Sequence, residues 1–424
     1  MKTFKFIHTA DLHLDSPFKG ISEVDPELSL SLTEVTFKTF SSIIDLCIKE
    51  GVLFLLISGD IYNGEDRSLR AQLRFRSELI RLYDADIKVF IAHGNHDPLD
   101  GWSANLEWPE NVHVFSGKNV ESITVDHQDE PVAAIHGISF STRKIASNLS
   151  RKFPKVSSKK EDIFSIGMLH CLVQGSTGHE PYSPCSLNDL ISRNYDYWAL
   201  GHVHSRAVLN KEDPVIIYPG NPQGLHPGEE GPRGCYLVKV NPEKNISFEF
   251  IETDAIRWAV EEFFIDDIQD AEELLSRLFS LIKDIKQRSD GRSALCRILL
   301  KGRGGLYSFL SRKGVCDDLV LELREFERGE SPFVWIESLK NLTQPPIDRD
   351  SLIKRDDFTG SLVRMFEEMY KNKESRDQIY KDLESLYASP AGRKYLEFPD
   401  EEHLILLMKK AESICLDRIL RSDS

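Results

Sequence analysis

The feature of this 424-residue chain that most constrains its fold is a set of five short polar motifs in its first half. They are Asp11-Leu12-His13, Gly59-Asp60, Gly94-Asn95-His96-Asp97, His170 and Gly201-His202-Val203-His204. Each motif directly follows an apolar run that predicts a β-strand. Loops at the carboxyl ends of strands in an α/β sheet are positioned by a rigid scaffold, so their side chains can converge. The motifs therefore predict one polar site at one edge of such a sheet.

The pattern of residues 1–255 predicts two sheets packed face to face and flanked by helices. Continuous apolar runs, typical of strands buried on both faces, predict strands at residues 2–9, 52–58, 87–92, 112–115, 132–136, 164–169 and 197–200. Residues 32–50 and 69–83 predict crossover helices, and the stretch from 207 to 251 is more purely β.

The patterning changes after residue 253 and again after Gln344-Pro345-Pro346. Between these points we expect a small α+β domain, with helices at 268–286 and 316–328 and strands at 294–301 and 333–339. Beyond them the pattern is helical, at 357–372, 375–387 and 401–420. The predicted domains are therefore residues 1–255, 256–343 and 344–424.

Composition favours a cytoplasmic protein that does not associate with membranes. No apolar run reaches transmembrane length, the N-terminus lacks signal-peptide features, and the seven scattered cysteines form no Cys-x-x-Cys pair. The net charge of −15 argues against tight DNA binding by the protein surface alone. It does not argue against phosphate chemistry, because bound metal ions bring their own positive charge.

The residue types in the motifs indicate a site for two divalent metal ions, since Asp, Asn and His are ligands that suit Mn²⁺, Fe²⁺ or Zn²⁺. Asp11 and His13 lie two residues apart, so an extended strand end would point both to the same side. Asp60 has two oxygens and is the natural bridge between two ions. His96 is a candidate proton donor, and Asp97 could orient it. Each motif alone is equally compatible with an ordinary turn; the joint occurrence of all five carries the prediction.

Longer segments around these motifs carry a family resemblance. They are residues 6–18 (FIHTADLHLDSPF), 58–62 (SGDIY), 93–97 (HGNHD), 199–204 (ALGHVH) and 218–223 (YPGNPQ). The sequence resembles the calcineurin-like metallophosphoesterase superfamily over residues 1–255. Within that superfamily it is similar to the SbcD/Mre11-type DNA repair exonucleases, in particular the YhaO-like branch. The resemblance implies a four-layer α/β/β/α sandwich, a small α+β capping domain of the DNA-recognition type, and a helical C-terminal extension that binds a partner.

The resemblance also implies roles for individual residues. One ion would be held by Asp11, His13, Asp60 and His204, and the other by Asp60, Asn95, His170 and His202. The ions would be manganese, although Fe²⁺ and Zn²⁺ suit the same ligands. A metal-bound hydroxide would attack a phosphodiester, and His96 would protonate the leaving group.

The function implied is a DNA nuclease that acts in DNA repair with an SMC/Rad50-like coiled-coil ATPase, and the family commonly forms homodimers. Two alternatives stay open: a phosphoesterase of the same fold acting on nucleotides or other small phosphodiesters, and a non-catalytic subunit that holds the ATPase on DNA. A basic run between the third and fourth motifs would contact DNA or form a solvated loop. It comprises Arg143, Lys144, Arg151, Lys152, Lys155, Lys159 and Lys160.

Overall fold

A computed structural model describes residues 2–18, 32–64, 68–104, 106–156, 163–174, 182–346, 348–388 and 400–422. The chain divides into two compact units. The first comprises Met1–Gly302 with Ser308–Thr343, and the second comprises Arg303–Tyr307 with Gln344–Ser424. The first unit contains the five motifs.

One six-stranded sheet has the order β12-β11-β1-β2-β3-β4. Its strands are β1 (Phe4–Thr9), β2 (Phe54–Ser58), β3 (Lys88–Ala92), β4 (Val112–Val114), β11 (Gly234–Val240) and β12 (Ile246–Glu252). Strands β1 to β4 are parallel, whereas β11 and β12 are antiparallel additions. Every residue of β2 is buried, as its continuous apolar run predicts.

The second six-stranded sheet has the order β5-β6-β7-β8-β10-β9. Its strands are β5 (Glu121–His127), β6 (Glu130–Gly137), β7 (Phe164–His170), β8 (Tyr197–Gly201), β9 (Ala207–Asn210) and β10 (Val215–Tyr218). Strands β6, β7, β8 and β10 are parallel. The carboxyl ends of parallel strands lie at the same edge, which is where the motifs follow β7 and β8.

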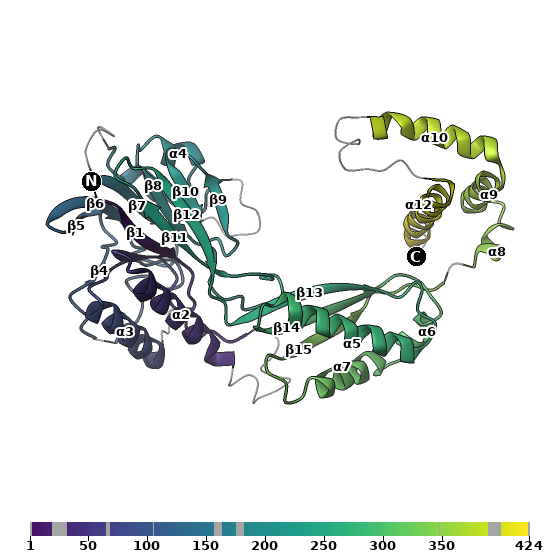
Figure 1. Cartoon of the computed structure of the whole chain (residues 1–424), viewed down its shortest axis with the longest axis horizontal. Helices are drawn as coiled ribbons and strands as arrows, with labels where there is room; N and C mark the ends of the chain where they lie inside the picture. Colours follow the sequence, from purple (N-terminus) through teal and green to yellow (C-terminus); the bar gives the residue numbers. More distant parts are fainter. Residues whose placement is uncertain are drawn as a thin grey trace. The chain divides into compact units, whose positions relative to one another are not determined.

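The predicted four-layer sandwich is confirmed. Phe6 and Phe54 of the first sheet pack with Met168 and Tyr197 of the second in the core between the sheets. Helices α2 (Val35–Glu50) and α3 (Leu69–Asp84) cover the outer face of the first sheet (Figure 1). The outer face of the second sheet is covered more sparsely, by α4 (Leu187–Ile191) and the 3₁₀ helix η1 (Leu149–Lys152). Strand β5 and helix α4 were not predicted.

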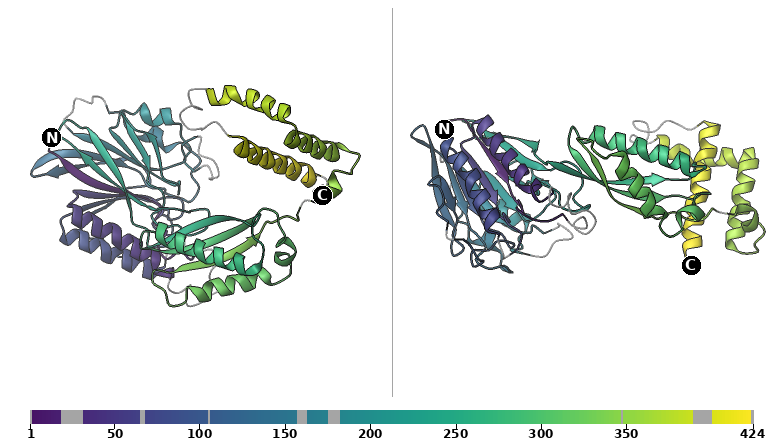
Figure 2. Two further views of the ribbon diagram at one scale, coloured as in Figure 1. Left: turned by 45° about the vertical axis from the view of Figure 1, so that its right-hand side comes forward. Right: turned by 90° about the horizontal axis from the view of Figure 1, so that it is seen from below.

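The remainder of the first unit is a small domain built on a parallel three-stranded sheet, β13-β14-β15. Its elements are β13 (Ile256–Phe264), α5 (Ala271–Arg288), β14 (Ser293–Lys301), α6 (Tyr307–Leu310), α7 (Val315–Phe326) and β15 (Val334–Asn341). Both α5 and α7 pack on this sheet (Figure 2). Helices α5 and α7 and strands β14 and β15 were predicted, whereas β13 and the short helix α6 were not.

A buried glutamine fastens this small domain to the sandwich. The Gln223 carbonyl oxygen accepts hydrogen bonds from Thr39 Oγ1 (3.0 Å) and from the backbone N–H of Ala255 (3.0 Å). Its amide nitrogen donates to the carbonyl oxygen of Ile256 at 2.7 Å. Trp258 and Leu295 then pack against Phe18 and Leu225 of the sandwich. The first residues of β13 are therefore held by the loop that follows β10.

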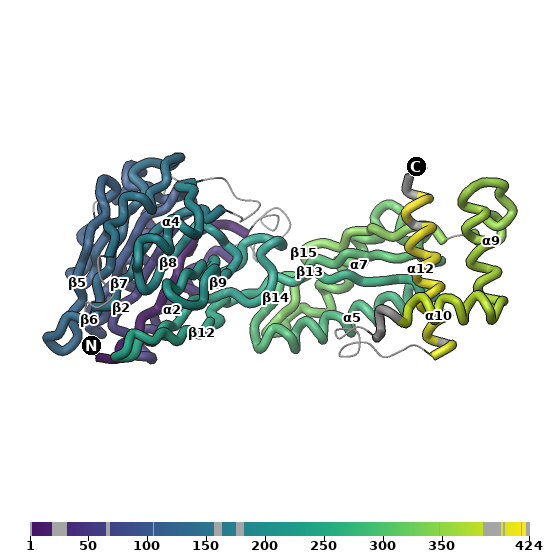
Figure 3. Tube along the Cα trace, turned by 90° about the horizontal axis from the view of Figure 1, so that it is seen from above, coloured from purple at the N-terminus to yellow at the C-terminus, as the bar shows by residue number. Residues whose placement is uncertain are grey.

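The second unit is helical, as predicted. Its helices are α8 (Arg349–Leu352), α9 (Phe358–Lys371), α10 (Lys373–Ala388) and α12 (Glu401–Ser422). Helix α9 packs against both α10 and α12 (Figure 3), and Val363 and Leu416 meet in a small apolar core. In the part of the chain that the structure describes, no helix has the length and apolar character needed to span a bilayer.

Candidate metal centre

All seven predicted ligands lie at one edge of the two sheets. Asp11 and His13 follow β1, Asp60 follows β2, and Asn95 follows β3. His170 is the last residue of β7, and His202 and His204 follow β8. The convergence predicted from the order of the motifs is therefore present in the fold.

Four of these ligands adopt left-handed backbone conformations. The φ angles are 53° at Asp11, 44° at His13, 53° at Asp60 and 99° at His202. The expectation that an extended strand end would direct Asp11 and His13 was therefore wrong, because the backbone of both residues is left-handed and not extended. Residues other than glycine with positive φ are uncommon, and such strain concentrates at functional sites.

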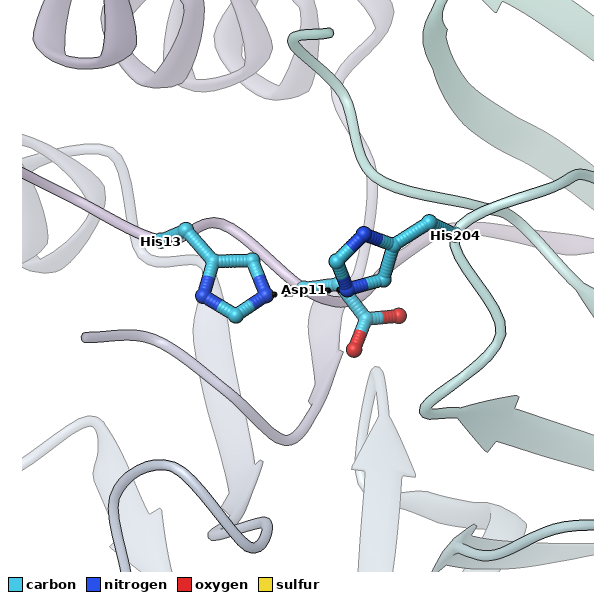
Figure 4. A group of neighbouring side chains, drawn as sticks. All are labelled: Asp11, His13 and His204. Carbon is cyan, nitrogen blue, oxygen red and sulfur yellow. Dashed lines mark hydrogen bonds between the residues drawn. The ribbon is translucent and has the colours of Figure 1, made fainter. Parts of the chain in front are cut away.

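Asp11, His13 and His204 form one group of potential donors, whose ligating atoms lie within 4.8 Å of one another. The Nε2 atoms of His13 and His204 are 3.1 Å apart and face each other (Figure 4). Nδ1 of His204 lies 2.6 Å from Glu229 Oε1 and donates its hydrogen to that carboxylate. The bond leaves Nε2 of His204 as the nitrogen available to a metal ion.

Asp60, His170 and His202 form the second group. Nε2 of His170 lies 3.0 Å from Asn95 Oδ1 and 3.4 Å from Asp60 Oδ2, so Asn95 joins this group. Nδ1 of His170 donates to the carbonyl oxygen of Ser58 at 2.9 Å. As in the first group, a hydrogen bond on Nδ1 directs Nε2 toward the other ligands.

Three glycines make room for His170. A Cβ atom at Gly59 would lie 2.2 Å from His170 Nδ1, and one at Gly94 would lie 2.3 Å from Asp60 Oδ1. A Cβ atom at Gly201 would lie 1.8 Å from the carbonyl oxygen of Ser58. The glycines of the motifs are thus required by the close approach of the ligands as well as by turn geometry.

Asp97 ties two of the ligand loops together. Its carboxylate accepts the backbone N–H groups of Asp60 (3.2 Å), Ile61 (2.9 Å) and Gly94 (2.7 Å). The imidazole bound to it is that of His93, whose Nδ1 lies 3.0 Å from Oδ2. This partner lies four residues before Asp97 and was not predicted; the predicted orientation of His96 by Asp97 stays a prediction.

His96 lies beside the first group. Its ring centroid is 5.1 Å from that of His13, and its backbone N–H donates to Asp60 Oδ1 at 2.9 Å. The side chain is only partly buried. His96 is thus anchored by its backbone while its imidazole stays close to the donor atoms and accessible from outside.

The electrostatics of the centre couple its carboxylates to its imidazoles. Burial raises the pKa of Asp11 to about 6 and lowers that of His13 to about 3. Burial alone would lower the pKa of His170, but the charge of Asp60 and the hydrogen bond with it raise that pKa to about 9. The charge of His170 in turn holds the pKa of Asp60 well below its usual range, against the effect of burial.

The donor set fits two divalent cations. Each group combines a carboxylate with imidazole nitrogens, the second adds an amide oxygen, and the facing nitrogens of His13 and His204 need a proton or a cation between them. Without thiolates, these ligands do not distinguish manganese from iron or zinc. The predicted bridging role of Asp60 stays a prediction.

Sequence analysis missed Glu229 as a supporting residue. Its carboxylate binds His204, accepts the N–H of Leu225 at 2.7 Å, and lies 3.2 Å from His226 Nε2. Burial would raise the pKa of Glu229, but the hydrogen bond from His204 and the charge of that histidine lower it to about 2. The signal in the sequence is the position of Glu229 within the Gly- and Pro-rich stretch 224–232, which also contains His226.

Other residues that the sequence pattern offers lie on the surface of the first unit. In the basic run, Arg143, Lys144, Arg151, Lys152 and Lys155 are exposed, while Lys159 and Lys160 lie outside the described residues. Trp102 is exposed, whereas Trp108 packs edge-on against Phe75 of α3. The fold therefore leaves these cationic side chains and Trp102 accessible to solvent.

Known protein families match two parts of this chain. Residues 4–206 match the calcineurin-like phosphoesterase family, and residues 258–344 match the middle domain of the metallophosphoesterase YhaO. The chain is 36% identical to the uncharacterized metallophosphoesterase YhaO of Bacillus subtilis over 98% of both chains. It is 25% identical to the DNA double-strand break repair protein Mre11 of Sulfurisphaera tokodaii, over 51% of this chain and 53% of that protein. A dimetal phosphatase structure from Danio rerio covers 59% of this chain and 96% of its own, with 13% identity and a TM-score of 0.37.

The clearance at Gly94 gives a first prediction. In Gly94→Ala the new methyl group meets Asp60 Oδ1 and the His170 ring, so the second donor group must open. We expect Mn²⁺ affinity to fall by about tenfold or more, measured by isothermal titration calorimetry. Gly305→Ala is the matched control, because a Cβ atom there has no neighbour within 4 Å. Equal affinities for the two variants would contradict this account of the site.

The raised pKa of His170 leads to a prediction of how metal affinity depends on pH. In the metal-free protein, His170 keeps its proton below a pKa of about 9, and a metal ion must displace it. Affinity should therefore rise with pH between 7 and 9, by about tenfold per unit for one displaced proton, and level off above 9. Calorimetric titrations of the protein with Mn²⁺ at each pH measure the affinity, and buffers of different ionisation enthalpy give the number of protons released. A metal affinity that does not change with pH would show that His170 is neutral in the metal-free protein.

Proposed function

The chain belongs to the calcineurin-like metallophosphoesterases of the YhaO family, and we propose that it is a two-metal phosphodiesterase whose substrate is DNA. The observation that carries this proposal is the meeting of two donor groups, with His96 beside them, at one edge of both sheets. Two ions at this edge would neutralise the oxygens of a phosphodiester and lower the pKa of a water molecule.

The chain's own residues prepare the site for that chemistry. Ser58 and Glu229 fix which nitrogen His170 and His204 present, so no rotation of these rings is needed when a cation binds. Asp97 and Asp11 hold loops from different strands through backbone N–H groups. Such preorganisation keeps the donors in place during turnover.

His96 has the position expected of a general acid. Its ring lies next to His13 at the border of the donor groups, and it is accessible to a leaving group that approaches from outside. A protonated imidazole there would deliver a proton to the leaving oxygen as the P–O bond breaks. This role is separate from metal binding, since His170, His202, His13 and His204 supply the imidazole donors.

DNA as substrate is supported by relatives and by the surface. The archaeal Mre11 proteins that this chain resembles are DNA double-strand break repair proteins. Their alignments cover about half of this chain. The basic residues of the run at 143–155 and Trp102 are accessible, and cationic and aromatic side chains suit a nucleic acid strand. The net charge of −15 means that bound ions or a partner would supply much of the affinity.

We also propose that a coiled-coil ATPase of the SMC/Rad50 type is the partner and that the second unit receives it. Support comes from apolar side chains left exposed on its helices, among them Phe358 of α9 and Leu406 and Ile414 of α12. A homodimer is a further proposal. Co-purification from native cells tests both, and a protein recovered alone as a monomer would contradict them.

The proton-donor assignment predicts the behaviour of His96→Ala. The variant should bind Mn²⁺ as the wild type does but lose turnover by about 10²- to 10⁴-fold, the usual contribution of a general acid. Metal content and steady-state rates on bis-p-nitrophenyl phosphate measure the two effects separately. His127→Ala, in the β5–β6 hairpin at the opposite edge of the sheet, is the matched control. Loss of metal together with activity would show that His96 is a ligand.

The substrate is tested by comparing DNA ends, cyclic nucleotides and bis-p-nitrophenyl phosphate with the purified full chain and Mn²⁺. We expect cleavage of DNA and of the small diester, because the same two-ion site would act on both. Activity confined to the small esters would overturn DNA as substrate while leaving the phosphodiesterase in place. If the metal-loaded protein cleaves none of these substrates, the proposal that it is a phosphodiesterase is wrong.

A further inference from the structure

A pocket of about 210 Å³ adjoins the first donor group. Its walls include His204, Arg206, Pro219, Glu230, Arg233 and Phe250. These residues follow β8 and β10, precede β11 and end β12, so all belong to the edge of the sheets that carries the metal centre. His204 contributes to both places, and whatever fills the pocket therefore lies next to the site of the chemistry.

Two guanidinium groups give this pocket its charge. Arg206 stacks over the ring of Phe250, with Cζ 4.1 Å from the ring centroid. Arg233 is nine-tenths buried and donates to Asn221 Oδ1 at 2.5 Å and to the carbonyl oxygen of His204. Among the described residues, neither arginine forms an ion pair with a carboxylate. Glu230 is the carboxylate in the wall, so cationic groups outnumber it.

The backbone around Gly220 helps to shape the pocket, in addition to the side chains that line it. Gly220 has a φ of 77°, and a Cβ atom there would lie 2.7 Å from the carbonyl oxygen of His204 and 2.9 Å from the N atom of Arg206. The turn after β10 thus packs directly on the segment that carries both the metal ligand and Arg206. Burial lowers the pKa of Arg233; the charges of Glu229 and Asp254 oppose this effect, and the charge of Arg206 adds to it.

We propose that this pocket binds a second phosphate group of the substrate, the one adjacent to the scissile phosphodiester on a nucleic acid strand. Arginine binds phosphate with several donors at once, and an unpaired guanidinium beside a buried one is suited to an anion. The proposal rests on the proposed function and extends it, since the site would prefer a strand over a substrate with a single phosphate.

The experiment measures a thymidine hexanucleotide as an inhibitor of bis-p-nitrophenyl phosphate hydrolysis by the full chain with Mn²⁺, at several salt concentrations. Arg206→Ala should raise the inhibition constant by about tenfold, as expected for one charge-assisted contact. It should also reduce the slope of the logarithm of that constant against the logarithm of salt by about 0.7, the value for one phosphate contact on a single strand. Arg206→Lys keeps the charge and should keep the slope.

Lys239→Ala is the matched control, because it removes one exposed positive charge from β11 near the opposite edge of the sheet. An unchanged constant and slope in Arg206→Ala, or an equal change in Lys239→Ala, would overturn the assignment. An effect seen with inorganic pyrophosphate and absent with the hexanucleotide would assign the pocket to a terminal diphosphate and also overturn it. If the wild type does not hydrolyse the small diester, the proposed function fails, and the same variants are then compared by fluorescence anisotropy of a labelled hexanucleotide.

Discussion

The burial of three carboxylates at one sheet edge is the constraint on which the rest of the site depends. Asp11, Asp60 and Asp97 are almost fully buried, and buried charges are tolerated only when they are paired and hydrogen-bonded. Each accepts a backbone N–H from another loop: Asp11 from His202, Asp60 from His96, and Asp97 from Ile61. The loops that carry the ligands are therefore fastened to one another by the ligands and by Asp97, across both sheets.

The close packing of the ligand loops also accounts for the glycines and the positive φ angles in these loops. His170 fits between the loops only because Gly59, Gly94 and Gly201 carry no side chain, and Asp60 reaches it from a left-handed turn. The loop after β10 continues this packing outward, since Glu229 binds the ligand His204 while Gln223 binds the backbone of Ile256. A displacement at the start of β13 would therefore be transmitted through one short loop to a residue of the metal centre.

Much of the fold could be predicted, because buried parallel strands leave continuous apolar runs, as in residues 54–58 and 164–170. The convergence of the ligands followed from their positions after such strands. Strand β13 was missed because charged residues, Glu261 and Glu262, interrupt its apolar pattern. The pairing of Asp97 with His93 and of Glu229 with His204 depends on turns whose φ and ψ angles the sequence pattern does not specify, so the supporting residues were found only in the structure.

A chain with a net negative charge could still bind a polyanion if its positive charges gather at one place on the surface. The carboxylates of the centre are paired with imidazoles, as Asp60 is with His170, and this arrangement favours cations over phosphate. Bound ions would reverse the sign of the local field, and Arg206 and Arg233 extend the positive region beyond His204. Because the chain as a whole carries a net charge of −15, a strand would be attracted most where bound ions and basic side chains lie together, so electrostatics would favour binding at the edge that carries the metal centre.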